Sequence, residues 1–413
     1  MNIYLIVILV SVIGAYLLEN TAVFLNVRHL DPAVPKEFID VVDREKYRRS
    51  QEYTRKQSKV NLFHSSVNLA IVLAFILGGG FAWLDGLVRT FSLGPVWTGL
   101  IFFAFLGIAL DLASLPFEIY TTFVLEEAFG FNRTTPGLFI KDKLKGYLLA
   151  LVIGGPLLSG VLLFLGRYPD WGWLFAWSLV TLVMLLLHFL APTLILPLFN
   201  TFIPLEDGEL KRKIEAYARR NGFDLSGIFV MDGSRRSTKS NAFFTGLGRK
   251  KRIALFDTLI ERHEPDELVA VLAHEIGHYK KRHIRKNMIL AIAKTGILLY
   301  LVSLFISHPP LFAAFGLYQP SVYAGLVFFA LLYTPIALLL SLYLNSLSRK
   351  FEYQADAFAA ETTKRPENLI QALKRLSVDN LSNLTPHPFY VFVNHSHPPV
   401  LNRIKALRRQ ETA

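Results

Sequence analysis

The stretch 270-AVLAHEIGHYKKRH-283 places a short polar motif directly before an apolar run. His274 and His278 are four residues apart, and Glu275 follows the first histidine. On a helix these histidines share one face, so their imidazoles can bind one ion. The preceding 264-EPDE-267 places proline and acidic residues where a helix begins. The stretch therefore predicts a helix that presents two histidines to a metal.

The chain around this motif has the composition of a membrane protein. Of its 413 residues, 52% are hydrophobic and 18% are charged, whereas soluble domains carry about 25% charged residues. Several segments reach the roughly 20 apolar residues that cross a bilayer. The seven predicted spans are 1–25, 62–84, 94–115, 147–166, 172–199, 288–307 and 321–346. We expect breaks at Asp85-Gly86 and Pro116, and a kink near Pro192 and Pro197.

The net charge of +12 is spread unevenly over the loops. Segments 26–61 and 117–146 hold nine and four Lys or Arg residues, whereas 308–320 holds none. The positive-inside rule then places the basic loops in the cytoplasm, together with 200–287 and 347–413. This topology accounts for the charge, and we predict no nucleic-acid partner because no binding signature accompanies it. The chain has no cysteine, which excludes disulfides, thiolate ligands and a cysteine nucleophile.

The spans divide the chain into four predicted parts. Segment 1–199 holds spans one to five, 200–287 is a cytoplasmic insert, 288–346 holds the last two spans, and 347–413 is a cytoplasmic C-terminal segment. We expect the insert to be a small α+β unit. Its predicted elements are a helix at 206–221, strands at 227–231, 241–245 and 252–256, a loop at 234–240 and a turn at 246–251.

A third metal ligand is expected, because a catalytic zinc has three protein ligands and one open position. The stretch 348-SRKFEYQADAFAAE-361 carries Glu352 and Asp356 four residues apart. One carboxylate can bind the metal while the other accepts the free ring N–H of a ligand histidine. Both motifs adjoin a span on the same side of the membrane. The plainer alternatives are a pair of surface histidines and an ordinary charged helix end.

With a late His-Pro-Pro, these motifs resemble the type I CAAX prenyl proteases, integral-membrane zinc metalloendopeptidases related to the heat-shock membrane protease HtpX. The resemblance covers essentially the whole chain. It implies a mainly α, polytopic fold, with seven transmembrane helices forming a barrel around a large chamber, capped by a cytoplasmic gluzincin-type α+β zinc metalloprotease domain. It also implies one Zn²⁺ per chain bound by His274, His278 and Glu352, with Glu275 as general base and Asp356 supporting a ligand.

The segment 240-SNAFFTG-246 resembles the edge strand of that family. The backbone of a peptide substrate would add there as a further strand, against Asn241, Ala242 and Phe243. By its residue type alone, Asn241 is equally typical of a turn. The resemblance thus predicts a substrate-binding edge next to the metal.

The segment 394-NHSHPPVLNR-403 resembles the late motif of the family, which brings His397 and Arg403 to the catalytic site. There they would stabilise the developing oxyanion. Without the family, His397 is typical of a cap beside two prolines. The histidines expected to be solvated, in or beside polar loops, are His29, His263, His283 and His387.

Four charged residues lie within or at the ends of the predicted spans, namely Glu19, Asp111, Glu118 and Lys294. Charged side chains at such depth normally face a cavity rather than lipid. For Lys294 the alternative is that its long stem reaches the lipid headgroups, since the cytoplasmic edge is only about ten residues away.

The leading functional hypothesis is a zinc metalloendopeptidase that cuts peptides at the cytoplasmic face of a bacterial inner membrane or an endoplasmic reticulum. The resemblance implies a peptide or protein substrate with a prenylated CAAX tail, cleaved after the cysteine, and contact with membrane lipid. No obligate protein partner is expected. The alternatives are an HtpX-like quality-control protease, a seven-span transporter or receptor with a structural metal site, and a lipid-surface scaffold without catalysis.

Overall fold

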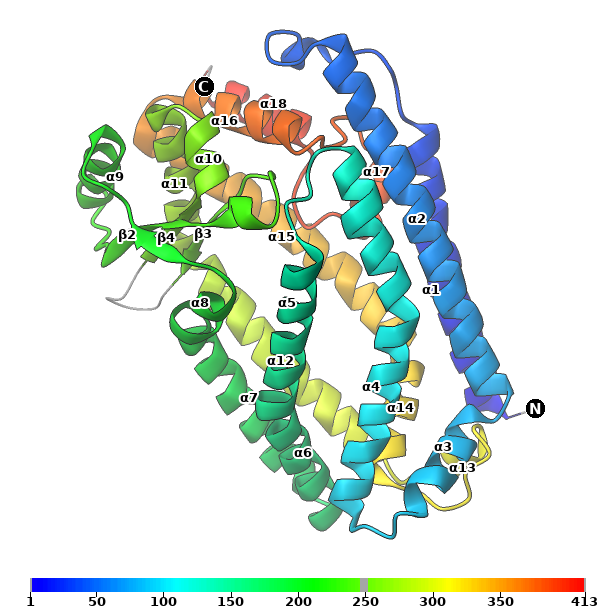
Figure 1. Cartoon of the computed structure of the whole chain (residues 1–413). Coiled ribbons are helices and arrows are strands. Elements are labelled where there is room, and N and C mark those ends of the chain that lie inside the picture. Colours follow the sequence, from blue (N-terminus) through cyan, green and yellow to red (C-terminus); the bar gives the residue numbers. More distant parts are fainter. Residues whose placement is uncertain (1, 246–251, 412–413) are drawn as a thin grey trace.

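Long helices make up most of the computed structural model, which describes residues 2–245 and 252–411 (Figure 1). Within these residues, six helical runs are long and apolar enough to cross a membrane, and a bent pair gives a seventh. The runs are α1 (Ile3–Arg28), α2 (Arg44–Leu77), α4 (Pro95–Tyr120) with a π-helical end to Glu126, α5 (Pro136–Leu149) leading into α6 (Gly155–Arg167), α7 (Gly172–Leu190) leading into α8 (Leu196–Phe199), and α12 (His283–Phe305). The bent pair is α14 (Val322–Leu332) and α15 (Thr334–Thr363), at 57°. The mainly α, multi-span fold is therefore confirmed.

Two of the predicted breaks are wrong. Asp85 lies inside α3 (Gly80–Arg89), and the chain bends instead at Gly79, whose φ of +71° costs glycine little. Pro116 lies inside α4, and the helical run continues to Glu126. Proline is tolerated within a span because π-type adjustments satisfy the freed backbone groups. Near Pro192, where the sequence predicts a kink, a π-helical segment at Ala191–Ile195 interrupts the fifth run.

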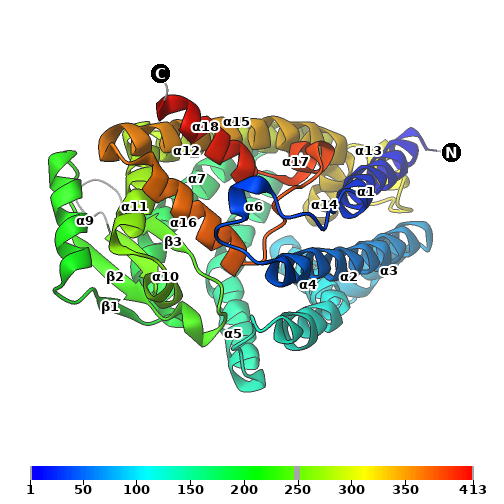
Figure 2. The same cartoon turned by 90° about the horizontal axis from the view of Figure 1, so that it is seen from above.

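The spans contact one another in a closed order. Helix α1 packs on α2, α2 on α4, α4 on α6, α6 on α7, α7 on α12, α12 on α14, and α14 and α15 return to α1 (Figure 2). In each of the six runs, at most 17% of the apolar window is buried within the protein, as expected for side chains that face lipid. The large chamber inside this ring stays a prediction.

The insert contains a four-stranded sheet in the order β1-β2-β4-β3. Strands β2 (Gly227–Met231) and β4 (Arg252–Phe256) pair in parallel, while β1 (Phe202–Pro204) and β3 (Ala242–Thr245) pair antiparallel at the two edges. Helix α9 (Glu209–Arg220) matches the predicted amphipathic helix. Strand β1, three residues long, was not predicted, and the predicted turn 246–251 lies outside the described residues.

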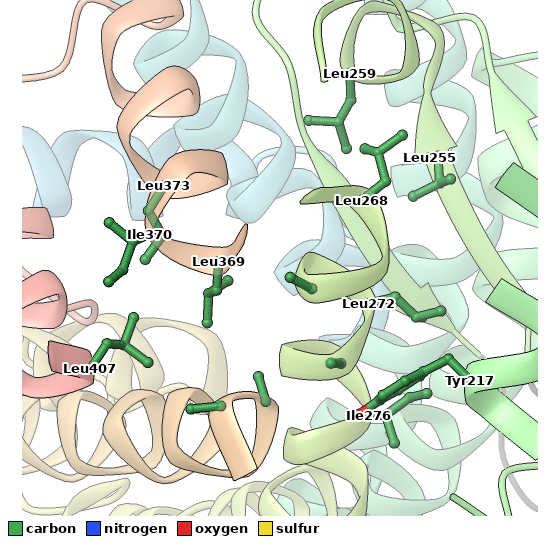
Figure 3. Packing of buried hydrophobic residues seen from close by; sticks show 14 of the residues in the cluster. Tyr217, Leu255, Leu259, Leu268, Leu272, Ile276, Leu369, Ile370, Leu373 and Leu407 are labelled. Atoms are coloured by element: carbon green, nitrogen blue, oxygen red, sulfur yellow. The ribbon is translucent and has the colours of Figure 1, made fainter. Parts of the chain in front are cut away.

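The helix with the two histidines, α11 (Pro265–Lys280), lies at the centre of the largest apolar core. A capping box of Glu264 and Glu267 fixes its start. Its residues Leu268, Leu272 and Ile276 recur every four positions and pack towards the sheet and α9 (Figure 3). The other contributors shown come from β4, α10 (Asp257–Arg262), α16 (Pro366–Asp379) and α18 (Val400–Glu411). Burial on several sides holds α11 in one position.

Basic residues of the loop 234–240 attach the insert to the spans. Arg236 donates to Asp142 of α5 at 2.9 Å. Lys239 donates to Glu126, at the end of the α4 run, at 3.0 Å and to Tyr53 of α2 at 2.8 Å. Three membrane runs therefore fix the segment that leads into β3.

Candidate metal centre

The site begins with an unusually close approach of α11 to α15. A Cβ atom on Gly277 would lie 3.0 Å from both the Cα and the carbonyl oxygen of Ala355, so only glycine permits this contact without a shift. Ala355 is fully buried. The helices meet one turn away from Glu352, which places this carboxylate opposite the histidine face of α11.

The side chains of His274, His278 and Glu352 converge from these two helices. The two Nε2 atoms are 3.1 Å apart; Nε2 of His274 lies 3.5 Å from Oε2 of Glu352, and Nε2 of His278 lies 3.3 Å from the other oxygen, Oε1. Nitrogen and oxygen ligands about 2.0–2.1 Å from a tetrahedral zinc are separated by about 3.3 Å. These separations are close to those within a zinc ligand set, and one ligand atom from each of the three residues lies within 4.8 Å of the others.

One carboxylate oxygen of this group also lacks a hydrogen-bond partner suited to a metal-free site. Glu352 Oε2 is buried and receives no well-aligned hydrogen bond in the described part of the chain, although His397 Nδ1 lies 3.0 Å away. Two imidazole nitrogens 3.1 Å apart must share a proton or a cation, because their lone pairs would otherwise repel. The donor set of two imidazoles and a carboxylate fits zinc.

Asp356 and Arg403 hold His274 from behind. The Nδ1–H of His274 donates to Asp356 at 2.8 Å, which leaves Nε2 free to bind a metal. Arg403, on α18, donates to both oxygens of Asp356, at 2.8 and 2.6 Å. This two-point contact gives Arg403 a positioning role. Its predicted action on an oxyanion stays a prediction.

His278 has a corresponding support in His283, which was expected to be solvated. That expectation is wrong, because His283 is 1% exposed and stacks on Phe351 at 4.2 Å. Its Nε2 lies 2.9 Å from the amide oxygen of Gln354, and its Nδ1 lies 3.1 Å from Nδ1 of His278. If Nε2 donates to Gln354, Nδ1 accepts from His278, and Nε2 of His278 is left for the metal. The left-handed turn at Arg282, with φ of +60°, folds His283 inward.

Burial and hydrogen bonding shift the proton affinities of the site in opposite directions. Burial alone would lower the pKa of His274, but hydrogen bonds to Asp356 and Glu352 outweigh it and raise the pKa to about 9. Burial would raise the pKa of Asp356, but Arg403 and His274 lower it to about 2. Burial would likewise raise the pKa of Glu352, but the imidazoles of His274, His278 and His397 that face its carboxylate hold this pKa far below its usual range. The site is thus a cluster of stabilised carboxylates that attracts a cation.

Two further predicted residues adjoin the ligand group: Glu275 follows His274 on α11, and Nδ1 of His397 lies 3.0 Å from Oε2 of Glu352. Glu275 is half-buried and has no hydrogen-bond or ion-pair partner within 2–245 and 252–411. His397 lies in the connection between α17 (Pro388–Asn394) and α18, and its side chain is 68% exposed. Both groups therefore remain accessible to a substrate.

The predicted substrate strand is the outer edge of the sheet. The backbones of Ala242 and Phe243 pair with Leu255 and Ala254 of β4 on one side, and among the described residues no strand pairs with the other side. Helix α11 contacts β3. Asn241 is exposed immediately before the strand, and its side chain accepts the N–H of Ala242 at 2.8 Å.

The intramembrane charges fall into two groups. Asp111 and Glu118 of α4 both pair with Lys143 of α5, at 2.8 and 2.7 Å. Glu19 and Lys294 are exposed and have no ion pair or hydrogen bond with any described residue. Sequence alone did not predict the link to Lys143, because it joins two separate spans.

A many-span fold with HExxH on one helix and a glutamate on the helix packed against it defines a membrane-embedded metallopeptidase. Family models agree. One described as CAAX prenyl protease N-terminal, five membrane helices, matches residues 24–201, and one described as Peptidase family M48 matches residues 204–411. The chain belongs to peptidase family M48.

Individual relatives extend over nearly the full chain. "CAAX prenyl protease 1 homolog" of Oryza sativa is 36% identical over 98% of this chain and 97% of the relative. "CAAX prenyl protease 1" of Saccharomyces cerevisiae is 37% identical over 91% and 88%. The crystal structure of S. mikatae Ste24p superposes with a TM-score of 0.93 at 34% identity, covering 98% of this chain and 99% of that one. The predicted family is confirmed.

Proposed function

We propose that this enzyme is a zinc metalloendopeptidase that cuts the C-terminal tail of CAAX-type prenylated substrates after the cysteine. The observation that carries the zinc site is the convergence of His274, His278 and Glu352, whose ligand atoms lie within 4.8 Å of one another with N–O separations close to those of a tetrahedral ligand set. The names of the relatives support the substrate class. The basic loops support a catalytic face in the cytoplasm, at a bacterial inner membrane or an endoplasmic reticulum.

The three ligands would hold the metal, and Asp356 and His283 orient the two imidazoles. Zinc, when bound, supplies a Lewis acid that polarises the scissile carbonyl and makes water more acidic. Glu275 accepts the proton of the attacking water and delivers it to the leaving amine. His397, exposed beside Glu352, donates to the oxyanion that develops.

The substrate backbone would pair with the free edge of β3, as a further antiparallel strand beside Asn241, Ala242 and Phe243. This pairing needs only main-chain groups, so it places the scissile bond without fixing the sequence. Specificity must then come from pockets beyond the strand.

The decisive experiment compares the wild type with Glu275→Gln on a farnesylated CAAX peptide, after chelation and after zinc is restored. The variant should keep zinc and lose cleavage, and chelation should abolish wild-type cleavage reversibly. Cleavage by the variant at a near wild-type rate would remove Glu275 from its role. Equal cleavage of unprenylated membrane proteins would favour an HtpX-like activity, and cleavage of nothing with zinc present would favour a structural metal.

A further inference from the structure

A cavity of about 370 Å³ lies between α12 and α15, where these helices enter the membrane region. This volume falls within the range of small-ligand sites. Its walls are mostly apolar side chains such as Leu290, Ile297 and Leu344. We call this cavity the α12–α15 groove.

The groove begins about one helical turn from residues of the metal centre. On α12 its nearest lining residue is Asn287, one helical turn beyond His283, which contacts the ligand His278. On α15 its nearest lining residue is Ser348, one turn before the ligand Glu352. Residues four apart share a helix face, so Asn287 and Ser348 lie on the faces of α12 and α15 that carry His283 and Glu352.

Lys294 is the cation of the groove. It lines the cavity among apolar residues, is exposed, and has no ion pair or hydrogen bond with any residue in 2–245 or 252–411. By contrast, Lys143 of α5 is paired with two carboxylates. A cation left unpaired in an apolar cavity selects an anionic group on an otherwise apolar ligand.

We propose that the α12–α15 groove binds the residues that follow the scissile bond, and that Lys294 pairs with the C-terminal carboxylate of the substrate. This inference rests on the proposed function, in which three residues follow the cysteine. Apolar walls with one terminal cation suit a short apolar peptide that ends in a free carboxylate. The groove would therefore select substrates by the number of residues between the scissile bond and the C-terminal carboxylate.

The distances agree with this length. Lys294 lies eleven residues after His283, which is roughly 16 Å along the axis of α12. Three extended residues span about 10 Å. A lysine side chain reaches about 6 Å and leans towards the helix N-terminus, and thus towards the metal centre, so the Lys294 cation can approach the end of such a peptide. A substrate one residue longer would carry its carboxylate about 3.4 Å too far.

The test compares four peptides on the zinc-loaded full-length enzyme: a farnesylated CAAX peptide with a free carboxylate, its C-terminal amide, and both forms extended by one residue. The wild type should prefer the free acid of natural length by roughly 10- to 100-fold in kcat/KM, mainly through KM, because one charge-assisted hydrogen bond is lost in each alternative. Lys294→Met should erase this preference, and Lys294→Arg should retain part of it. Lys350→Met is the matched control, because Lys350 lies on α15 outside the groove.

Each outcome decides between the two proposals. Equal cleavage of acid and amide by the wild type overturns the role of the groove while the proposed function stands, and this comparison needs no variant to fold. A preference that survives in Lys294→Met also overturns it, and assigns the lysine to lipid headgroups. Failure of the wild type to cut any of the peptides refutes the proposed function itself.

Discussion

His283 offers the sharpest test of how the metal centre is built. Replacing it with phenylalanine keeps a ring to stack on Phe351, which lies 4.2 Å away at an angle of 9°, but removes the nitrogen that faces His278. The Nδ1–H of His278 then has no acceptor and its ring is free to turn. Loss of such a support typically weakens metal binding 10- to 100-fold, about 1.4–2.7 kcal/mol. The cost of an unsatisfied buried donor, about 1–3 kcal/mol, gives the same range.

The assay is a competition titration of zinc against a fluorescent chelator, with the cobalt-substituted absorption spectrum as a second readout of ligand geometry. Contrary to the expectation that His263 is solvated, it is also buried, and it is bonded to Glu267 at 3.1 Å, but it lies before the start of α11. His263→Phe is therefore the matched control. It should change stability and leave zinc affinity unaltered. A zinc Kd for His283→Phe within twofold of wild type, with an unchanged cobalt spectrum, would refute the reasoning.

Three further predictions concern the same centre. Gly277→Ala should force α11 away from Ala355, because the added carbon would lie 3.0 Å from backbone atoms of Ala355. We expect at least a tenfold loss of zinc affinity. Unchanged affinity in the chelator titration would show that the two helices can adjust. In the metal-free protein the pKa of His274 is raised to about 9, so below that pH zinc must displace a proton from this histidine. The zinc Kd should therefore fall about tenfold per pH unit up to about pH 9 and then level off. A zinc Kd that does not change between neutral pH and pH 9 would contradict this. Arg403→Gln leaves the carboxylate of Asp356 buried without its cation, and should reduce the unfolding free energy by about 3–5 kcal/mol in denaturant titrations. Arg403→Lys should not restore this stability, because lysine cannot form the planar pair of hydrogen bonds that arginine donates to the two carboxylate oxygens.

The sequence could predict the parts of this site that depend on spacing along one helix. The four-residue interval of His274 and His278, and that of Glu352 and Asp356, places each pair on one face whatever the rest of the chain does. The parts that depend on two helices meeting were not visible. Gly277 matters because of Ala355, and His283 turns inward because Arg282 takes a left-handed conformation. Neither contact has a periodic pattern in the sequence.

The same reasoning explains why the break at Asp85 was misplaced. A charged residue beside glycine is a strong signal for a loop, but Asp85 is buried and accepts hydrogen bonds from Arg89 and Tyr323. Tyr323 lies on α14, so the partner that satisfies the carboxylate is 238 residues away. Gly79, with its left-handed φ, bends the chain without any such partner.

The metal centre is built on the ends of membrane-spanning helices rather than on a separate soluble domain. Glu352 and Asp356 lie on α15, and His283 begins α12, so both helices carry the site at one end and cross the membrane at the other. The core around α11 also includes Phe38 and Tyr47, which precede or begin the second span. Helices α12 and α15 therefore connect the metal centre directly to the membrane-spanning region. A change in how α12 and α15 sit in the bilayer moves the ligands directly, which is a physical reason for a protease of this kind to meet its substrate at the membrane surface.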